Sequence, residues 1–210
     1  MPSSIPFSVF LSAAILLAIT PGPGMFYVLA RSLKGGRRDG IASSFGTAIG
    51  GMAHVVAAAL GLSAVLATSA LAFNGIKYAG AAYLIYLGVR TIFATERSAH
   101  EAVPVADSTR RVLLQGIVTE VLNPKTALFF LAFIPQFIDP AGPIVTQFLL
   151  LGTLSVALNT TADLIVVLFA GPIGQALRSN MRLRRAQQRF TGGALIALGI
   201  YVAAADGRKS

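Results

Sequence analysis

The sequence contains no cysteine, no tryptophan, only two histidines and few charged residues. Without cysteine the chain can form no disulfide, run no thiol relay and offer no thiolate ligand to a metal. The patterns His-Glu-x-x-His and Gly-x-Ser-x-Gly are also absent, so the usual signatures of zinc and serine hydrolases are missing. We therefore predict that the protein is not an enzyme and holds no resident cofactor or metal.

Charged residues make up only 12% of the 210 residues, whereas hydrophobic residues make up 55%, and the mean hydropathy is +0.73. Apolar runs of about 20 residues, the length that crosses a bilayer as a helix, recur along the whole chain. The sequence thus predicts an all-α, polytopic membrane protein with almost no soluble part. The first run lacks a preceding basic segment and a small-residue cleavage pattern, so we interpret it as a retained span and not as a signal peptide.

We predict six transmembrane helices in a single domain, residues 1–210. A charged, cytoplasmic linker at about 96–111 divides this domain into repeat one, about 1–95, and repeat two, about 112–205. The predicted spans are residues 7–30, 41–70, 74–95, 112–135, 144–171 and 188–205.

The net charge of +9 comes from cations that are concentrated in alternate loops. Thirteen of the 17 lysines and arginines lie in the first, third and fifth loops, whereas the second loop has Lys77 and the C-terminal tail has Arg208 and Lys209. Basic loops stay in the cytoplasm, which explains this pattern without a nucleic-acid partner. It predicts that both termini lie outside.

The first predicted span is interrupted at Pro21-Gly22-Pro23. The two prolines leave the carbonyls of Leu17 and Ile19 without their helical donors. Such a segment is either an unwound site whose half-helix ends face a ligand, or a kink that neighbouring helices satisfy. We favour the ligand site, because a second break lies at the corresponding place in the other half.

This second break is Asn123-Pro124-Lys125, in the middle of the fourth predicted span. Pro124 deprives the Glu120 carbonyl of its helical donor, so this carbonyl must find another partner inside the protein. A lysine at this depth is costly unless it faces a cavity or a counter-charge. We interpret the Glu120 side chain as a partner for Lys125 or as a group near the cytoplasmic surface, and leave it out of the predicted site.

The two halves carry similar features in the same order, at offsets of 103, 106 and 111 residues. Because each half has an odd number of spans, the second half must enter the membrane from the opposite side. We therefore predict a 3+3 inverted-topology repeat in which broken helices 1 and 4 bring both breaks to the midplane. The matching pairs are Pro21 and Pro124, Gly46-Thr47 and Gly152-Thr153, and Leu87-Gly88 and Leu198-Gly199.

The second predicted span has Gly46, Gly50, His54 and Gly61 on one helical face, which indicates close helix packing. His54 lies near mid-depth. It either transfers protons, because histidine titrates near neutral pH, or ties two helices together through a fixed hydrogen bond. We favour proton transfer.

Ser155, Asn159 and Asp163 follow one another at four-residue spacing on one face of the fifth predicted span. A carboxylate inside a span is costly and marks a functional site by default. Burial disfavours the charged form of a carboxylate, so Asp163 suits the loading and release of a proton. Its alternative role is that of a static partner for Lys125 or His54, and both roles can hold at once.

At these residues the sequence resembles the LysE/RhtB family of amino-acid exporters. The similarity covers essentially the whole chain, in order, although Tyr78 stands where several members have a tryptophan. Its motifs are Thr20-Pro21-Gly22-Pro23, the Gly46/Gly50/His54 face, residues 79–88 (AGAAYLIYLG), Asn123-Pro124-Lys125, residues 133–137 (FIPQF), and Asn159-Thr160 with Asp163.

The resemblance implies a six-span carrier in the bacterial cytoplasmic (inner) membrane. Such a carrier expels amino acids such as homoserine, threonine, leucine or lysine, in exchange for protons. The substrate itself does not carry over, because members of the family differ in it. Whether the carrier works as a homo-oligomer is left open.

We predict that the two breaks jointly hold the substrate, with proton coupling beside them. Free N–H groups at a helix start and the Lys125 charge suit a carboxylate, whereas freed carbonyls suit an ammonium group. The alternatives are an exporter of another small solute or of a metal cation, and an intramembrane enzyme. The predicted substrate-binding residues are Pro21, Gly22, Pro23, Asn123, Pro124, Lys125 and Asn159, and the predicted proton-coupling residues are His54 and Asp163.

Overall fold

The computed structural model describes residues 7–68, 70–93 and 108–204. Within these residues the chain consists of helices joined by short connections and contains no strand, which confirms the predicted all-α class. The α-helices are α1 (Phe7–Ile19), α2 (Pro23–Thr68), α3 (Ala70–Ile92), α4 (Thr109–Val121), α5 (Pro124–Leu128), α6 (Ile144–Leu168), α7 (Ala170–Ser179) and α8 (Met181–Ala204). A π-helix, η2 (Phe129–Phe133), and a 3-10 helix, η3 (Ile134–Phe137), follow α5.

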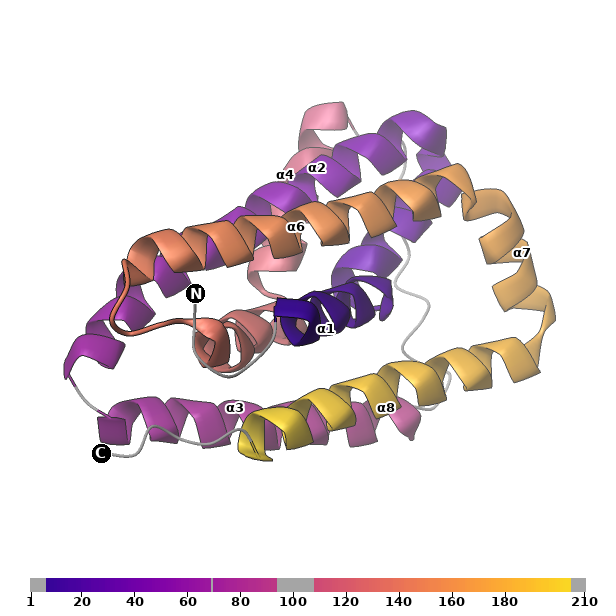
Figure 1. The fold of residues 1–210 in the computed structure, drawn as a ribbon. Coiled ribbons are helices and arrows are strands. Elements are labelled where there is room, and N and C mark those ends of the chain that lie inside the picture. The colour runs from indigo at the N-terminus through magenta and orange to yellow at the C-terminus, as the bar shows by residue number, and fades with distance from the viewer. Residues whose placement is uncertain (1–6, 69, 94–107, 205–210) are drawn as a thin grey trace.

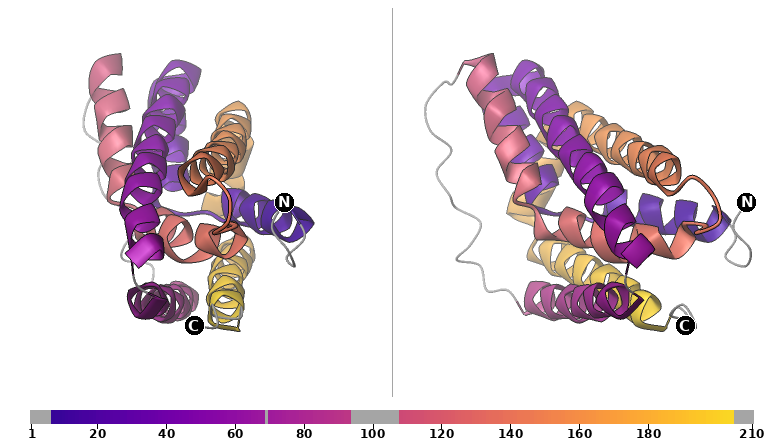
Figure 2. Two further views of the ribbon diagram at one scale, coloured as in Figure 1. Left: turned by 60° about the vertical axis from the view of Figure 1, so that its left-hand side comes forward. Right: turned by 90° about the vertical axis from the view of Figure 1, so that its left-hand side faces the viewer.

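The helices lie in three layers (Figures 1 and 2). One layer contains α2, α4 and α6, in which α2 packs against both of the others. A second layer contains α3 and α8, which lie side by side. Between these layers lie α1 and the segment from α5 to η3. The short helix α7 leads from the end of α6 to the start of α8.

Helix α2 is two antiparallel arms joined at Gly36, whose φ of 70° falls in the left-handed region that favours glycine. A Cβ on Gly40 would lie 2.3 Å from the Ser32 hydroxyl, and one on Gly24 would lie 3.5 Å from the Thr47 methyl group. The arms therefore pack against each other along their length. The first and second predicted spans are thus connected by a tight turn, and not by a longer loop.

Both predicted proline breaks are helix ends in the structure. Residues 20–22 separate α1 from α2, which begins at Pro23. The second break separates α4 from α5, and the two sides of it are bent by 46°. Pro124 is the first residue of α5, where a missing N–H costs nothing, and the Asn123 side chain accepts a hydrogen bond from the Lys125 backbone N–H at 3.1 Å.

An aromatic core surrounds the segment after the second break. Phe129 and Phe133 stack with ring centroids 4.9 Å apart, and the Phe133 ring lies 4.8 Å from Phe137 and 5.6 Å from Tyr201. Phe10 of α1 meets Phe137 edge-on at 5.4 Å. These contacts join α1, η2, η3 and α8, and so fix the direction in which the chain leaves the break.

Backbone contacts through glycine join α3 and α8. A Cβ on Gly88 would lie 2.5 Å from the Gly192 carbonyl oxygen, and one on Gly199 would lie 2.8 Å from the Ala81 carbonyl oxygen. Residue numbers rise along one helix as they fall along the other, so the pair is antiparallel. Small residues that let two backbones approach closely are typical of helix packing in membranes.

By length and composition, two described segments could cross a membrane: Ile144–Leu168, and Pro23–Gly61, which contains the turn at Gly36. The bent pair Thr109–Val121 and Pro124–Phe137 counts as a third if it forms one span. The remaining candidates are α1, which has 13 residues, and α3 and α8, which carry charged residues. The count of six spans therefore stays a prediction.

The structure corrects the predicted positions of two cations. Lys77 lies inside α3 and is 1% exposed, so its predicted place in a loop is wrong. Arg31, also predicted in a loop, lies in the first arm of α2 and is 2% exposed. The fifth predicted loop is largely helical, because it contains α7 and the start of α8. Most of the predicted linker, and the C-terminal cations, lie outside the described residues.

Candidate functional site

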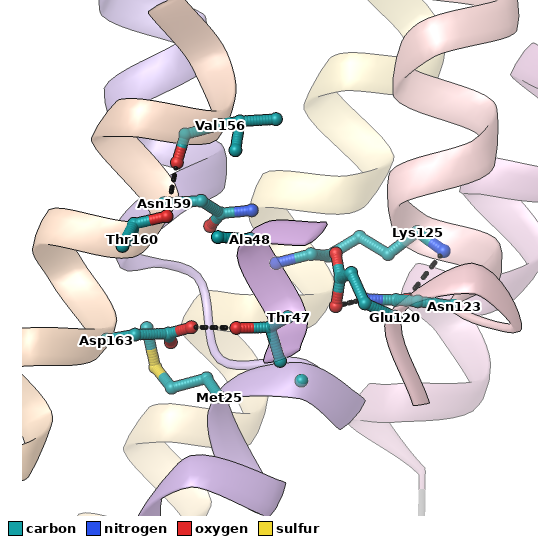
Figure 3. Close-up of a pocket in the computed structure, with 11 residues that line it drawn as sticks. Met25, Thr47, Ala48, Glu120, Asn123, Lys125, Val156, Asn159, Thr160 and Asp163 are labelled. Atoms are coloured by element: carbon teal, nitrogen blue, oxygen red, sulfur yellow. Dashed lines mark hydrogen bonds between the residues drawn. The ribbon is translucent and has the colours of Figure 1, made fainter. Parts of the chain in front are cut away.

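A polar pocket lies where both arms of α2 approach the second break and the middle of α6 (Figure 3). Its volume is about 370 Å³, part of which is open to the outside. Gly24, Met25, Ala48 and Val156 supply its apolar wall. The polar side chains around it are Thr47, Glu120, Asn123, Lys125, Asn159, Thr160 and Asp163.

Lys125 connects the two breaks across the molecule. Its ammonium group donates hydrogen bonds to the carbonyl oxygens of Leu17, at 3.1 Å, and Thr20, at 2.8 Å. These carbonyls belong to the end of α1, where the helix dipole favours a positive charge. The side chain is 6% exposed, so its desolvation is offset by these two acceptors and by nearby carboxylates.

Glu120 lies at the centre of the hydrogen-bond network, although we left it out of the predicted site. One carboxylate oxygen accepts from the Asn123 amide at 3.1 Å, and the other accepts from the Thr126 hydroxyl at 2.6 Å. The residue is 4% exposed and contacts the first arm of α2 at Gly24. The sequence signal was its position one turn before the break, which equally suited a residue near the cytoplasmic surface.

Asp163 forms the opposite wall of the pocket, on α6. One of its oxygens accepts a hydrogen bond from the Thr47 hydroxyl at 3.0 Å, which ties α6 to the second arm of α2 (Figure 3). Asp163 is 5% exposed. Asn159, one turn earlier on α6, points its amide into the same pocket. The predicted face of the fifth span thus does face the second break.

His54 lies beside the pocket and is not part of its lining. Its Nε2 atom lies 3.0 Å from the Glu120 carbonyl oxygen, which also accepts from the Asn123 backbone N–H at 3.0 Å. The carbonyl freed by Pro124 therefore finds two partners inside the protein, as the sequence required. The imidazole also stacks on Phe130, with ring centroids 6.1 Å apart.

The first break faces the second one through Lys125. A Cβ on Gly22 would lie 3.2 Å from the Lys125 ammonium nitrogen, so this glycine leaves room for the lysine. Pro21, Pro23 and Pro124 shape the breaks but do not line the pocket. Among the predicted substrate-binding residues, the structure brings Asn123, Lys125 and Asn159 into the pocket lining, together with Asp163 from the predicted proton-coupling pair.

A second polar contact fastens the first arm of α2 to the start of α4. Tyr27 donates a hydrogen bond to the Val112 carbonyl at 2.7 Å, and Arg31 donates to the Gln115 side chain. The Arg31 guanidinium also lies 5.4 Å from the centre of the Tyr27 ring. Sequence reasoning missed this group, because Arg31 resembled one more cation of a basic loop.

The family model described as LysE type translocator matches residues 15–206. The chain belongs to this family. A translocator of this kind is a membrane protein, and two similar chains are named uncharacterized membrane proteins. One, from Vibrio cholerae, is 31% identical over 93% of this chain and 95% of its own; the other, from Bacillus subtilis, is 33% identical over 91% and 95%.

A third relative of the translocator is a homoserine/homoserine lactone efflux protein of Salmonella typhimurium. It is 29% identical over 93% of this chain and 95% of its own length. No solved structure matches the translocator. Among the described residues, no group of three histidine, aspartate or glutamate side chains is arranged to hold a metal ion.

Proposed function

We propose that this translocator is a secondary exporter of small amino acids or their derivatives across the bacterial cytoplasmic membrane, driven by exchange for protons. The observation that carries the proposal is the pocket between the two proline breaks. Its lining presents an ammonium group from Lys125 and carboxylates from Glu120 and Asp163. Charges of both signs around one small space suit a zwitterion.

The chemistry of the relatives supports this substrate class. Two of them are named for the efflux of homoserine and its lactone. The lactone retains the ammonium group of the amino acid and lacks the free carboxylate. A pocket that accepts amino acids and such derivatives must therefore recognise the ammonium group, and treat the other end of the molecule less strictly.

The proposed roles follow from the geometry. An ammonium group has three N–H donors, and Lys125 uses two of them on the end of α1, so the third remains for a substrate carboxylate. Asn123 and Asn159 supply neutral hydrogen-bonding groups. In this proposal the residues Pro21, Gly22, Pro23 and Pro124 keep the breaks open.

The proposed architecture is six spans in a 3+3 inverted-topology repeat within one domain. The glycine contacts between α3 and α8 support it, because Gly88 touches Gly192 while Ala81 touches Gly199. At the offset of 111 residues, Gly88 corresponds to Gly199 and Ala81 corresponds to Gly192. The contact of Gly88 with Gly192 is therefore the counterpart, in the other half, of the contact of Gly199 with Ala81. This reciprocity is expected of two elements related by a two-fold axis.

Proton exchange supplies the energy that a zwitterion cannot take from the membrane potential. One proton that moves inward through ~100 mV contributes about 2.3 kcal/mol, enough for a roughly fortyfold gradient. We propose Asp163 as the main proton carrier, because it is a buried carboxylate at the pocket wall. We propose His54, whose Nε2 atom lies 3.0 Å from the Glu120 backbone carbonyl oxygen, as the relay or gate for Asp163.

Isotope counterflow in proteoliposomes, with a panel of amino acids, tests the exporter. A second assay imposes a pH gradient and compares the wild type with Asp163→Asn. We expect the variant to lose gradient-driven transport, whereas any exchange that remains at equal pH needs no net proton movement and should not respond to the gradient. If Asp163→Asn and His54→Gln both respond fully to the gradient, the coupling site lies elsewhere. Absence of counterflow with every amino acid would contradict the exporter itself.

A further inference from the structure

Two carbonyls at the first break are already engaged by the protein. Leu17 and Thr20 already accept hydrogen bonds from the Lys125 ammonium group. The Glu120 carbonyl, freed by the second break, is satisfied by His54 and the Asn123 backbone. For the ammonium end of a zwitterion, a carboxylate is a stronger acceptor than any of these engaged carbonyls. Within the pocket, the strongest acceptors are the two carboxylates.

The Glu120 side chain occupies space that exists only because two neighbouring residues of α2 are glycines. A Cβ on Gly24 would lie 2.4 Å from one carboxylate oxygen, and a Cβ on Gly50 would lie 2.7 Å from the Glu120 Cβ. Glycines on both arms of α2 thus admit this side chain between the helices. The donors from Asn123 and Thr126 then hold its two oxygens in place at the pocket wall.

Asp163 offers an acceptor that the protein does not use. One oxygen accepts from Thr47, and its other oxygen has no hydrogen-bond partner among the residues that the structure describes. The side chain is nevertheless 95% buried, being 5% exposed, and it borders the pocket. This oxygen is not fully buried, because the pocket leaves part of it accessible, so it can accept a donor from a ligand or from water that enters the pocket.

The charges of the pocket favour a cation. Glu120 and Asp163 provide up to two negative charges, against the single positive charge of Lys125, which is already engaged with α1. His54, the other titratable group at this place, faces the Glu120 backbone and not the space between the carboxylates. An incoming ammonium group would balance the remaining negative charge.

We propose that Glu120 and Asp163 together bind the ammonium group of the substrate, and that Glu120 makes this group a requirement for export. This inference rests on the proposed function and names the part of the substrate that is recognised. The substrates are then small solutes with a free primary ammonium group, amino acids and their lactones or esters alike. Solutes whose nitrogen is acylated are excluded, because they offer neither the charge nor enough donors.

The test uses the full-length protein in proteoliposomes and competition against labelled homoserine, threonine or leucine in counterflow. Each unlabelled amino acid is compared with its N-acetyl form. In the wild type we expect the N-acetyl form to compete about 100-fold more weakly or worse, because the paired carboxylates lose their charged partner. In Glu120→Gln we expect the free amino acid to compete at least tenfold more weakly (~1.4 kcal/mol), and the N-acetyl form to be unchanged. The ratio of the competition strength of the free amino acid to that of its N-acetyl form should therefore be smaller in Glu120→Gln than in the wild type.

Asp139→Asn is the matched control. It removes one carboxylate in the connection between η3 and α6, away from the pocket, and asparagine can still accept the hydrogen bond from the Ala141 backbone N–H. This variant should keep the wild-type ratio. Because the ratio is measured within one variant, a smaller amount of folded protein does not change it. If Glu120→Gln does not fold, the proposal is tested with the ratio of free to N-acetyl competition in the wild type and in Glu120→Asp.

The outcomes separate the two proposals. Equal competition by free and acetylated forms in the wild type overturns the ammonium site and leaves the exporter intact. An unchanged ratio in Glu120→Gln overturns the role of Glu120 in the same way. Failure of every amino acid to drive counterflow in the wild type overturns the proposed function, and the ammonium site with it.

Discussion

Lys125 shows how one side chain serves two parts of the protein. Its ammonium group closes the end of α1 by binding the carbonyls of Leu17 and Thr20, and the same nitrogen borders the polar pocket. If a substrate binds in the pocket as proposed, its effect on Lys125 would reach the first break through these two hydrogen bonds. This arrangement couples the two proline breaks without any intermediate residue.

Lys125→Met should abolish export while the protein still reaches the membrane. The substitution leaves buried carboxylates without their counter-charge, and removing one partner of such a group costs about 3–5 kcal/mol. Efflux from proteoliposomes and the thermal unfolding midpoint in detergent measure the two effects separately. Lys34→Met, the same change at the exposed turn of α2, is the control and should export normally. Wild-type efflux by Lys125→Met would refute a direct role.

Gly24→Ala tests the space that Glu120 occupies. The new Cβ would meet a carboxylate oxygen at 2.4 Å, so the carboxylate must move away from Asn123 or the first arm of α2 must shift. Because the displaced atom is the end of a flexible side chain, we expect little loss of stability, whereas moving the proposed acceptor should lower export about tenfold (~1.4 kcal/mol). Gly61→Ala, where no atom lies within 4 Å, should leave efflux unchanged. Equal efflux by both variants would show that the position of Glu120 is unimportant.

At the scale of elements, the helices differ in how they are held together. The segment after the second break is fixed by the aromatic core around Phe133, whereas α3 and α8 are joined through glycine and backbone. Because contacts between backbones cannot adjust by changing rotamers, the α3–α8 pair should tolerate less change than its apolar composition indicates.

Gly88→Ala should destabilise the protein by about 1–3 kcal/mol, since its Cβ would lie 2.5 Å from the Gly192 carbonyl oxygen. Gly193→Ala, on the same interface helix but with no atom within 4 Å, should be neutral or stabilise by about 0.5–1 kcal/mol. Thermal or denaturant unfolding of the purified protein in one detergent compares the pair. A smaller loss in Gly88→Ala than in Gly193→Ala would contradict the close α3–α8 packing.

At the scale of the whole molecule, the distribution of cations predicts the orientation in the membrane. The turn of α2 and the junction of α7 with α8 both carry exposed arginines, including Arg37, Arg38, Arg182 and Arg185. Basic connections of this kind remain in the cytoplasm. Because Arg31 and Lys77 are buried in helices, the cytoplasmic loops and the outside connections each lose one cation from the count. The predicted orientation is unchanged.

A C-terminal alkaline phosphatase fusion should therefore be active, and a green fluorescent protein fusion at the same place should be dark. Both reporters read the side of the membrane on which the terminus lies. A fusion at the turn of α2 is the internal control and should give the reverse pattern. Cytoplasmic fluorescence of the C-terminal fusion, together with a silent phosphatase, would overturn the predicted topology.

The sequence by itself determined the helical class, the membrane setting and both proline breaks. These features depend on local chemistry: apolar runs have a fixed length requirement, and proline removes a donor wherever it stands. The same reasoning required a new partner for the Glu120 carbonyl, and the structure supplies His54 and the Asn123 N–H. The four-residue spacing of Asn159 and Asp163 likewise predicted that they share a face.

Only the tertiary structure decided which partners these groups have. Lys125 turned out to bind the end of α1, more than 100 residues away along the chain, and Asp163 to bind Thr47. Glu120 gained its place because glycines on both arms of α2 leave space for it, and no local pattern around Glu120 contains that information. Burial of a charge is decided by the helices that pack around it, which is why sequence alone assigned Arg31 to a loop and left Glu120 out of the predicted site.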